Sequence, residues 1–345
     1  MQARAQNAAA LQWTDGKSLR VDGQGFQDLK GPWDRLPGRA EGVVRKAVWD
    51  LSRQPAGINV RFVTDATTIH ARWKVANQRF APQTMAPLAG SGLDLYARTP
   101  DGHWRWVAAS APTEFPLNEK KVIENIRAGR REYMLYLPLQ NPVESLEIGV
   151  AQGAKIEAAP ARTQKPLVFY GTSITHGAAA SRPGMIHTSI LSRRFDWPVI
   201  NLGFSGNGKL ELEVAKFLVE LDPVSYVIDC LPNLVASEVA ERTVPFVEFM
   251  RKAKPNTPML LVEDRTYQDS YWVEARRKRN DESRAEFRKA YAQLLAKGVK
   301  GLSYLGGEGL LGSDGEGTVD ASHPTDLGFV RQANAFEPYL SQWLR

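Results

Sequence analysis

The sequence predicts two domains, a jelly-roll-like β-sandwich over residues 1–160 and a flavodoxin-like three-layer α/β/α domain over residues 161–345. Two patterns support this fold class. Short alternating strands, separated by turns about every ten residues, fill the first part and are typical of a β-sandwich. Apolar strands alternating with helical segments fill the second part and indicate parallel βαβ units. The stretch between them, residues 158–166, carries prolines and no periodicity, so we place the domain boundary there.

Alternation of apolar and polar residues locates the strands of the first domain. Six strands are predicted, at Ile58–Val63, Thr68–Val75, Leu93–Ala97, Trp104–Ala108, Tyr133–Leu137 and Leu146–Val150. The dipeptide Asp65-Ala66 is the predicted turn between the first two strands. Asp101-Gly102 is the predicted tight turn of a hairpin between the next two. We predict no helix in this domain.

The second domain is predicted to contain five strands and five helices in alternation. The strands are Leu167–Tyr170, Val199–Leu202, Tyr226–Asp229, Met259–Val262 and Leu302–Leu305. The helices are Thr188–Phe195, Glu211–Glu220, Val235–Lys254, Glu282–Lys297 and Leu327–Trp343. Such an alternation produces a parallel sheet with helices on both faces.

The composition is that of a globular protein. The 345 residues suffice for one large or two ordinary domains, and 43% are hydrophobic and 24% charged. No apolar run approaches the roughly 20 residues that span a bilayer, so we expect no membrane-spanning helix. The net charge of +6 comes from 44 basic and 38 acidic residues spread along the chain, with the densest basic cluster at Arg276–Arg279. We therefore expect a solvated surface and no nucleic-acid partner, with binding of an acidic polymer as the alternative.

The single cysteine and the first ten residues bear on chemistry and location. Cys230, the one cysteine, excludes an intramolecular disulfide and an all-cysteine metal site, and its apolar surroundings predict a core position. Residues 1–10 lack the apolar core of about 7–15 residues that a signal peptide carries. We expect either a cytoplasmic protein or a periplasmic or secreted one from which a signal peptide has been removed. The sequence indicates neither a cofactor nor an oligomeric state.

A serine follows the first strand of the second domain. The stretch Leu167–His176 reads LVFYGTSITH, in which a short apolar strand ends at Gly171, just before Ser173. Ligands of parallel α/β sheets bind beyond the carboxyl ends of the strands, so a hydroxyl here faces the crevice where chemistry is usually done. Two interpretations are open: Ser173 is a nucleophile, or it caps the next helix.

A nucleophilic serine needs a base, because its hydroxyl is almost wholly protonated at neutral pH. His323 follows the fifth strand, in VDASHP, with Asp320 three residues earlier. In a turn, that separation lets the carboxylate reach the imidazole Nδ1–H, so that Nε2 faces the serine. The remaining histidines are given structural, surface or pocket-wall positions: His70, His103, His176 and His187.

An oxyanion formed at the serine needs hydrogen-bond donors at the same sheet edge. Gly206 ends the sequence NLGFSG after the second strand, and a glycine lets a backbone N–H approach a substrate closely. Asn233 ends DCLPN after the third strand and offers a side-chain amide. Alone, Gly206 fits an ordinary loop and Asn233 a helix N-cap. Their order with Ser173 and His323 at successive strand ends favours a site built around a nucleophilic serine.

These four blocks resemble those of the SGNH/GDSL hydrolase superfamily. GTSIT at 171–175 is similar to the nucleophile block GDSIT, NLGFSG at 201–206 to the glycine block, and DASH at 320–323 to the Asp-x-x-His block. The chain departs from the pattern twice. Thr172 stands in place of an aspartate, and Leu231-Pro232-Asn233-Leu234 stands in place of Gly-x-Asn-Asp.

Longer segments resemble a two-domain subgroup that has a β-sandwich before the hydrolase domain. They are GLDLY at 92–96, YGTSITHG with ASRPGM, DCLPN, VEDR at 262–265 and GEGTVDASHPTDLGF at 315–329. The resemblance implies a serine esterase that removes acetyl or another small acyl group from carbohydrate, with no cofactor and no metal. It implies Ser173 as nucleophile, His323 as base and Asp320 as the carboxylate that orients it. It also implies an oxyanion hole of the Ser173 and Gly206 N–H groups with Asn233.

Four further residues are predicted near the substrate. The loop Asp264–Asp281 leaves the fourth strand at the same edge and is predicted to lack secondary structure. It carries Tyr267 and Trp272, whose rings suit a sugar; a solvated loop with packed aromatic side chains is the alternative. Arg182 and His176 follow the nucleophile and are predicted pocket residues, with a salt bridge as the alternative for Arg182.

Two other functions share these features. An acyltransferase would form the same acyl-enzyme and pass the acyl group to an alcohol other than water. A carbohydrate-binding protein with an inactive hydrolase domain would use the sandwich and its tryptophans instead. We expect the sandwich to pack against the second domain and wall the site, and the substrate to be a small-molecule or glycan ester.

Overall fold

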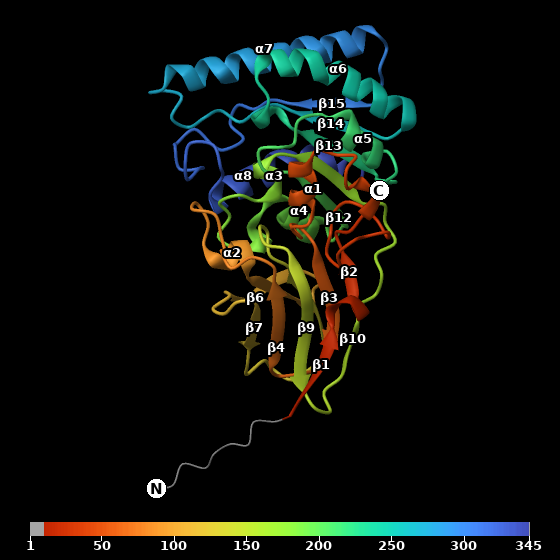
Figure 1. Cartoon of the computed structure of the whole chain (residues 1–345), viewed down its shortest axis with the longest axis vertical. Coiled ribbons are helices and arrows are strands. Elements are labelled where there is room, and N and C mark those ends of the chain that lie inside the picture. The colour runs from red at the N-terminus through yellow and green to blue at the C-terminus, as the bar shows by residue number, and fades with distance from the viewer. Residues whose placement is uncertain (1–9, 345) are drawn as a thin grey trace.

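Three β-sheets form the framework of the computed structural model, which describes residues 10–344 (Figure 1). Two antiparallel sheets occupy one end of the molecule, and a five-stranded parallel sheet with helices on both faces occupies the other. This arrangement confirms the predicted fold class. The expectation about a signal peptide in residues 1–10 falls almost wholly outside the described residues.

The sandwich is built from one sheet with the order β1-β9-β4-β7 and another with the order β10-β3-β8-β5-β6, where β2 also pairs with β3. The strands are β1 Leu11–Asp15, β2 Arg20–Asp22, β3 Asn59–Thr64, β4 Ile69–Val75, β5 Leu93–Arg98, β6 Trp104–Ser110, β7 Leu117–Ile123, β8 Arg131–Tyr136, β9 Val143–Ala151 and β10 Ile156–Ala158. Buried side chains from both sheets, among them Phe62, Trp73 and Ile148, meet in one core.

Strand β4 shows why alternation predicts this domain. Ile69, Ala71, Trp73 and Val75 are buried, whereas the residues between them are partly or fully exposed. The hairpin of β5 and β6 forms as predicted. The structure adds β1, β2, β7 and β10, which alternation does not reveal. Two of these have only three residues, and β7 carries three charged residues at the edge of its sheet.

The prediction that the first domain contains no helix is wrong. Two short helices interrupt it, α1 Lys46–Ser52 and α2 Pro87–Ser91. With seven and five residues, they span two turns or fewer, so the 3.6-residue period of a helix has too few repeats to be recognised. Pro87 begins α2, where its fixed φ suits the first helical position.

The parallel sheet has the order β12-β11-β13-β14-β15. Its strands are β11 Leu167–Gly171, β12 Val199–Gly203, β13 Ser225–Asp229, β14 Met259–Val262 and β15 Leu302–Leu305, close to their predicted positions. Its helices are α3 Ser173–His176, α4 His187–Phe195, α5 Leu212–Leu218, α6 Ala236–Ala253, α7 Glu274–Ala296 and α8 Asp326–Ser341. Gly171 pairs with both Gly203 and Asp229, so the carboxyl ends of β11, β12 and β13 are level.

Each face of this sheet has its own core. Val168 and Tyr170 of β11 face a cluster that includes side chains of α5, α6 and α7. Leu167 and Phe169, which alternate with them, face a cluster that includes α4 and α8. In the view of Figure 1, α6 and α7 accordingly lie on one side of the sheet and α4 and α8 on the other.

A segment from the first sixth of the chain completes one of these cores. Phe26, Leu36, Val44, Val48 and Trp49 are buried in the same cluster as Tyr170 and the helices α5 and α6. Figure 1 shows α1, which contains Val48 and Trp49, at the level of the parallel sheet rather than among the sandwich strands. Most of the buried apolar side chains of residues 26–52 therefore pack as part of the α/β layer, whereas Trp33 is buried in the sandwich core.

Arg35 fastens this segment to the edge strand β12. Its side chain is almost fully buried, and its guanidinium donates to the carbonyl oxygens of Asn201 at 3.1 Å and Gly203 at 2.7 Å. It also donates to the carbonyls of Leu51 at 2.8 Å and Gln54 at 2.6 Å. Burial lowers the pKa of Arg35 to about 9, which still leaves the group charged at neutral pH. The outward-facing carbonyls of the edge strand thus receive donors that a further strand would otherwise supply.

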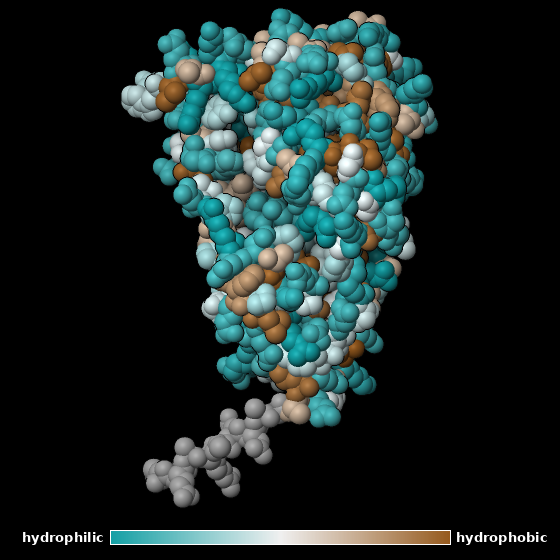
Figure 2. All heavy atoms as spheres, in the orientation of Figure 1, coloured by the Kyte–Doolittle hydropathy of each residue, from teal (hydrophilic) through white to brown (hydrophobic). Residues whose placement is uncertain are grey.

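The face of the molecule shown in Figure 2 is mainly hydrophilic. On the face shown in Figure 2, hydrophobic side chains lie in small, separate groups among hydrophilic ones. Within residues 10–344, no helix combines the length and the apolar character needed to cross a membrane.

His187 is the polar member of an aromatic cluster under the parallel sheet. Its ring lies 5.7 Å from Phe169, 5.8 Å from Phe329 and 5.5 Å from Phe336, between ring centroids. Neither ring nitrogen has a hydrogen-bond partner among the described residues. Burial holds the pKa of His187 well below its usual 6.5.

The replacement His187→Phe is expected to weaken the acid sensitivity of folding. The unfolded chain takes up a proton at this histidine below about pH 6.5 while the folded protein does not, so stability is present above that pH and falls as the pH drops. Between pH 7.5 and 5.5, this histidine is expected to account for about 1.4 kcal/mol of lost stability. Denaturant unfolding at both pH values, with the exposed His103→Asn as control, measures the difference. Equal pH dependence in His187→Phe and the wild type contradicts the assignment.

Candidate active site

Ser173, His323 and Asp320 form a hydrogen-bonded chain at the carboxyl edge of the parallel sheet. The Ser173 hydroxyl lies 2.8 Å from His323 Nε2, and His323 Nδ1 lies 2.7 Å from Asp320 Oδ2. Ser173 is the first residue of α3, just after β11, whereas His323 and Asp320 lie in the loop between β15 and α8. The fold thus brings together a serine and a histidine that are 150 positions apart.

Thr172, not Ser173, caps the helix that follows β11. The Thr172 hydroxyl accepts a hydrogen bond from the Ile174 N–H at 3.3 Å. The interpretation of Ser173 as the helix cap is therefore wrong, and its hydroxyl is free to donate to His323. The GDSIT block, which residues 171–175 resemble, has an aspartate at this position, and here Thr172 supplies the oxygen acceptor instead.

The loop that carries His323 holds Asp320 in place. Asp320 Oδ1 accepts from the backbone N–H groups of Ser322 at 3.1 Å and His323 at 2.7 Å, while Oδ2 faces the imidazole. Burial alone would raise the pKa of Asp320, but the bonds from the backbone and ring of His323 outweigh it and lower that pKa. The carboxylate therefore stays charged at neutral pH and fixes the ring with Nε2 toward Ser173.

The loop after β14 supports the histidine loop from outside. Gln268 donates its backbone N–H to the Ala321 carbonyl at 3.0 Å, and its side-chain oxygen accepts from the Thr318 hydroxyl at 3.1 Å. Ala321, between Asp320 and His323, has a φ of 72°. This left-handed conformation is unusual for alanine, so contacts on both sides are needed to maintain it.

A cavity of about 420 Å³ opens in front of Ser173. Its wall contains all four residues that the strand ends predict: Ser173, Gly206, Asn233 and His323. The remaining lining residues are Pro82, Thr84, Met85, Gln140, Ala178, Ser205, Pro232 and Ser322. Pro82, Thr84, Met85 and Gln140 come from the sandwich domain, and nothing in their local sequence indicates a place at the site. Only the packing of the two halves brings them there.

Gly206 and Asn233 both present donors to this cavity. Gly206 has a φ of 70°, a Cβ on it would meet no atom within 4 Å, and within residues 10–344 its N–H donates no backbone hydrogen bond. The Asn233 amide oxygen accepts from the N–H groups of Asn207 at 3.0 Å and Gly208 at 3.2 Å in the orientation that satisfies both donors. This orientation leaves the Asn233 NH₂ group available. Val235, not Asn233, occupies the N-cap position of α6, so the helix-cap interpretation of Asn233 is wrong.

His176 lies beneath the site rather than in its wall, which corrects the prediction of a pocket residue. It is fully buried, and its Nε2 is 2.8 Å from the Leu139 carbonyl while its Nδ1 is 3.2 Å from the Ser205 hydroxyl. Burial, together with the charge of Arg35, keeps the pKa of His176 well below 6.5. It therefore stays neutral and links the sandwich to the loop of Ser205. Gly203 allows α3 to approach β12 closely, because a Cβ at position 203 would lie 2.2 Å from the backbone nitrogen of His176.

Arg182 is also displaced from its predicted place, and its alternative, a salt bridge, is what the structure shows. Its guanidinium donates to Asp94 Oδ2 at 2.8 Å and to the Tyr96 hydroxyl, and it lies 5.3 Å from the centre of the Trp106 ring. Asp94 also accepts from the Gly184 N–H at 2.8 Å. Asp94 and Tyr96 belong to the GLDLY segment, so this segment holds the loop that follows α3.

The loop after β14 is shorter than predicted, because α7 begins at Glu274 rather than near 282. The Tyr267 hydroxyl accepts from Arg279 at 2.7 Å, and its ring lies against the guanidinium groups of Arg276 and Arg279. Trp272 is 82% exposed. Neither aromatic residue lines the cavity in front of Ser173.

A buried ion pair underlies Ser173. Arg265, from the VEDR segment, forms a two-pronged contact with Asp229 at the end of β13, with Nη2 2.8 Å from Oδ2. The same Asp229 oxygen accepts from the Thr175 hydroxyl of α3 at 3.1 Å, and Arg265 Nε donates to Gln332 of α8 at 2.7 Å. Asp229 and Arg265 are both essentially inaccessible to solvent. The pair therefore joins α3, which begins with Ser173, to α8, which follows the His323 loop.

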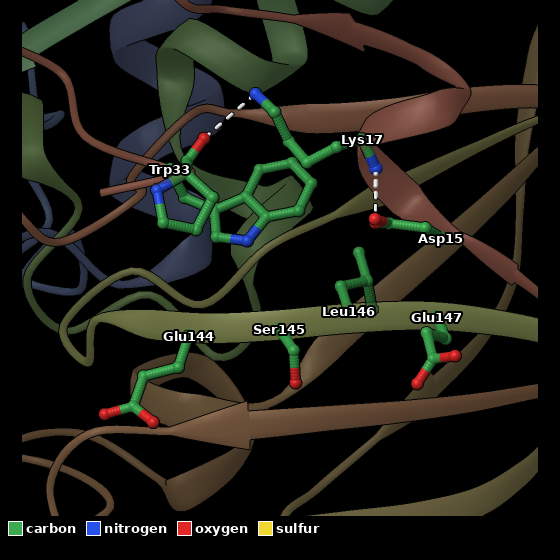
Figure 3. Close-up of a pocket in the computed structure, with 8 residues that line it drawn as sticks. Asp15, Lys17, Trp33, Glu144, Ser145, Leu146 and Glu147 are labelled. Carbon is green, nitrogen blue, oxygen red and sulfur yellow. Dashed lines mark hydrogen bonds between the residues drawn. The ribbon is translucent and has the colours of Figure 1, made fainter. Parts of the chain in front are cut away.

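A separate cavity of about 200 Å³ lies on the sandwich (Figure 3). It contains Ser145, but no histidine lines it. Lys17 is engaged, since its ammonium donates to the Pro32 carbonyl at 2.9 Å and lies 4.9 Å from the centre of the Trp33 ring. Among the described residues, no group of three or more His, Cys, Asp or Glu side chains is arranged to hold a metal ion.

The chain matches two family models. Residues 164–341 match the GDSL-like lipase/acylhydrolase family, and residues 11–156 match the N-terminus of SGNH-hydrolase-type esterases. No curated protein sequence matches the chain.

Several solved structures are similar over most of their length. A GDSL-like lipase from Bacteroides ovatus is 32% identical with a TM-score of 0.93, covering 97% of this chain and 98% of its own. A salicylyl-acyltransferase from a tetracycline biosynthetic pathway is 19% identical with a TM-score of 0.75, covering 99% and 98%. A family two carbohydrate esterase from Cellvibrio japonicus is 12% identical with a TM-score of 0.59, covering 98% and 99%. At these lower identities, the last two show a shared fold.

The replacement Arg265→Gln is expected to lower the free energy of unfolding by about 3–5 kcal/mol, because it leaves the Asp229 carboxylate buried without its cation. The double variant Asp229→Asn with Arg265→Gln is expected to recover part of that loss, since no unpaired charge remains. Denaturant unfolding of the wild type, both single variants and the double variant measures the coupling.

The exposed ion pair of Arg130 with Glu157 provides the matched control. Arg130→Gln is expected to change the free energy of unfolding by at most about 1 kcal/mol. Similar losses in Arg265→Gln and Arg130→Gln would contradict a special role for the buried pair.

Proposed function

The chain belongs to the GDSL-like lipase/acylhydrolase family, and we propose that it is a serine esterase that removes acetyl or another small acyl group from a carbohydrate ester. The observation that carries the proposal is the chain of hydrogen bonds from Ser173 through His323 to Asp320, at 2.8 and 2.7 Å. This spacing suits transfer of the serine proton to the imidazole as the hydroxyl attacks. The reaction needs no metal or cofactor in this scheme.

In the acylation step, Ser173 Oγ attacks the ester carbonyl while His323 Nε2 accepts its proton. Asp320 holds the imidazole and stabilises the imidazolium that forms. The tetrahedral oxyanion is stabilised by the N–H groups of Ser173 and Gly206 and by the Asn233 NH₂ group, all of which border the cavity. His323 then returns the proton to the leaving alcohol oxygen as the C–O bond breaks.

In the deacylation step, water enters from the solvent side of the cavity and attacks the acyl-serine. His323 takes a proton from this water and later gives it to Ser173 Oγ, so that the carboxylic acid leaves and the enzyme is restored. The small-acyl part of the proposal is supported by the residues next to Ser173. Met85, Pro82 and Ala178 line the same cavity and give part of its wall an apolar surface that suits a small acyl group.

The replacement Ser173→Ala is expected to lower kcat/KM for p-nitrophenyl acetate at least about a thousand-fold, because the nucleophile is lost. The matched control is Ser145→Ala in the cavity of Figure 3, where no histidine serves as a base; its activity is expected to equal that of the wild type. Mass spectrometry after brief treatment with an organophosphonate is expected to find the label on Ser173. Turnover that survives in Ser173→Ala would overturn the proposal, and acetylated glycerol as the main product with added glycerol would favour an acyltransferase.

The replacement Asn233→Ala is expected to lower kcat about 10²–10³-fold, because one donor to the oxyanion is lost before the reaction begins. Asn233→Asp keeps the size of the side chain but removes the donor, so it is expected to be impaired at least as strongly. Steady-state kinetics with p-nitrophenyl acetate and thermal unfolding together separate catalysis from folding. A lowered Tm with unchanged kcat in Asn233→Ala would show a structural role instead.

A further inference from the structure

A second cavity adjoins the one in front of Ser173. It has a volume of about 460 Å³ and shares the residues Pro82 and Gln140 with the first cavity, whose volume is about 420 Å³. All of its lining residues belong to the sandwich half of the chain: Gln54, Asn77, Gln78, Arg79, Ala81, Pro82 and Gln140. We name this second cavity the amide cleft. A molecule that reaches Ser173 can extend into it past Gln140.

Four of the seven lining residues carry a side-chain amide, and Arg79 adds a guanidinium. An amide offers two N–H donors and one carbonyl acceptor, so it can both donate to and accept from a hydroxyl group. A set of such amides suits a ligand that presents several hydroxyl groups. It suits an alkyl chain poorly, because burial of unpaired amides is costly.

The amide cleft is built to hold its shape. The buried Asn141 accepts from the Asn77 N–H at 3.0 Å and donates to the Asn77 carbonyl at 2.9 Å and to the Ser91 hydroxyl at 2.9 Å. Ser91 in turn donates to the Phe80 carbonyl, and the Gln140 N–H donates to Gly90 at 3.0 Å. The loop of residues 77–81 is thus fixed to α2 before any ligand binds, which lowers the entropic cost of binding.

Two amides of the amide cleft have unused hydrogen-bonding atoms. Gln54 Oε1 and Gln140 Nε2 are shielded by their surroundings and have no partner among the described residues. One is an acceptor and the other a donor. The protein covers these two atoms, so they add to the polar character of the cleft wall, and the exposed amides of Asn77 and Gln78 are the groups that a ligand can reach.

We infer that the amide cleft binds the alcohol part of the ester and that this alcohol is polyhydroxylated, such as a sugar ring. The inference rests on the proposed esterase function, because the acyl group must lie at Ser173 for the alcohol to extend past Gln140. The sandwich domain then selects the alcohol, while the α/β domain carries out the chemistry. Figure 1 shows α2, to which the loop of residues 77–81 is fixed, at the junction of these two halves.

The double variant Asn77→Ala with Gln78→Ala tests the inference. Both side chains are exposed and make no hydrogen bond through their amides within the described residues, so folding is expected to be preserved. The substrates are methyl 6-O-acetyl-β-D-glucopyranoside, which has free hydroxyl groups, and p-nitrophenyl acetate, which has none. The ratio of kcat/KM for the sugar ester to that for p-nitrophenyl acetate is expected to fall about ten-fold. The control Gln152→Ala, an exposed amide after β9, is expected to leave the ratio unchanged.

Binding measured without turnover separates this inference from the esterase proposal. Calorimetric titration of Ser173→Ala with the same sugar ester is expected to show binding that weakens about ten-fold when Asn77→Ala and Gln78→Ala are added. One outcome is that binding depends on these residues but the wild type does not turn the sugar ester over. That result would support the amide cleft as a sugar site and contradict the esterase proposal. Turnover of the sugar ester with an unchanged ratio and unchanged binding in the double variant would overturn the inference and leave the esterase proposal intact.

Discussion

A guanidinium buried at the edge of the parallel sheet joins the two halves of this molecule. The edge strand β12 has carbonyl oxygens that no neighbouring strand can pair, and Arg35 donates to two of them, at Asn201 and Gly203. Its other described partners, Leu51 and Gln54, lie in the segment that leads back into the sandwich. Every described hydrogen-bond partner is a carbonyl, and the guanidinium also lies 5.1 Å from the centre of the Phe204 ring. The charge is therefore stabilised by dipoles and an aromatic face rather than by a counter-ion, and a small displacement would leave several buried groups unpaired. Arg35 thus holds the segment that leads into the sandwich against the edge strand of the parallel sheet.

The position of the sandwich loops allows the first domain both to pack against the α/β domain and to contact a substrate. These two roles would exclude each other only if they required different residues. Here Asn141 holds Asn77 through hydrogen bonds while its neighbour Gln140 lines both cavities. Met85 packs into the core that contains Ile174 of α3 and also lines the cavity in front of Ser173. The same short segments therefore stabilise the junction and shape the region in front of Ser173.

The positions of the parallel strands and the placement of Ser173, Gly206, Asn233 and His323 could be predicted because each residue follows a recognisable apolar strand, and the ends of parallel strands share one edge. The cavity wall from the sandwich could not, since contacts between distant segments have no local period. The start of α7 was hidden for another reason: after Ala275 its first two turns are wholly polar, so no apolar stripe marks it. Nearness in sequence misled for His176, because the ring at the end of α3 is buried between the Leu139 carbonyl and the Ser205 hydroxyl, and the local sequence does not reveal these contacts.

The use of residues 26–52 to cover the parallel sheet has a consequence for how the protein is made. A chain leaves the ribosome from its N-terminus, so this covering segment exists well before β12 and β11 are synthesised. When the edge strand emerges from the ribosome, residues 26–52 have already been synthesised and can cover it. The interval in which an open edge could pair with another chain is therefore short. A fragment that starts after the sandwich would lack this protection, together with Arg35 and the side chains of α1. The catalytic layer is thus a discontinuous folding unit whose first piece is translated long before its centre.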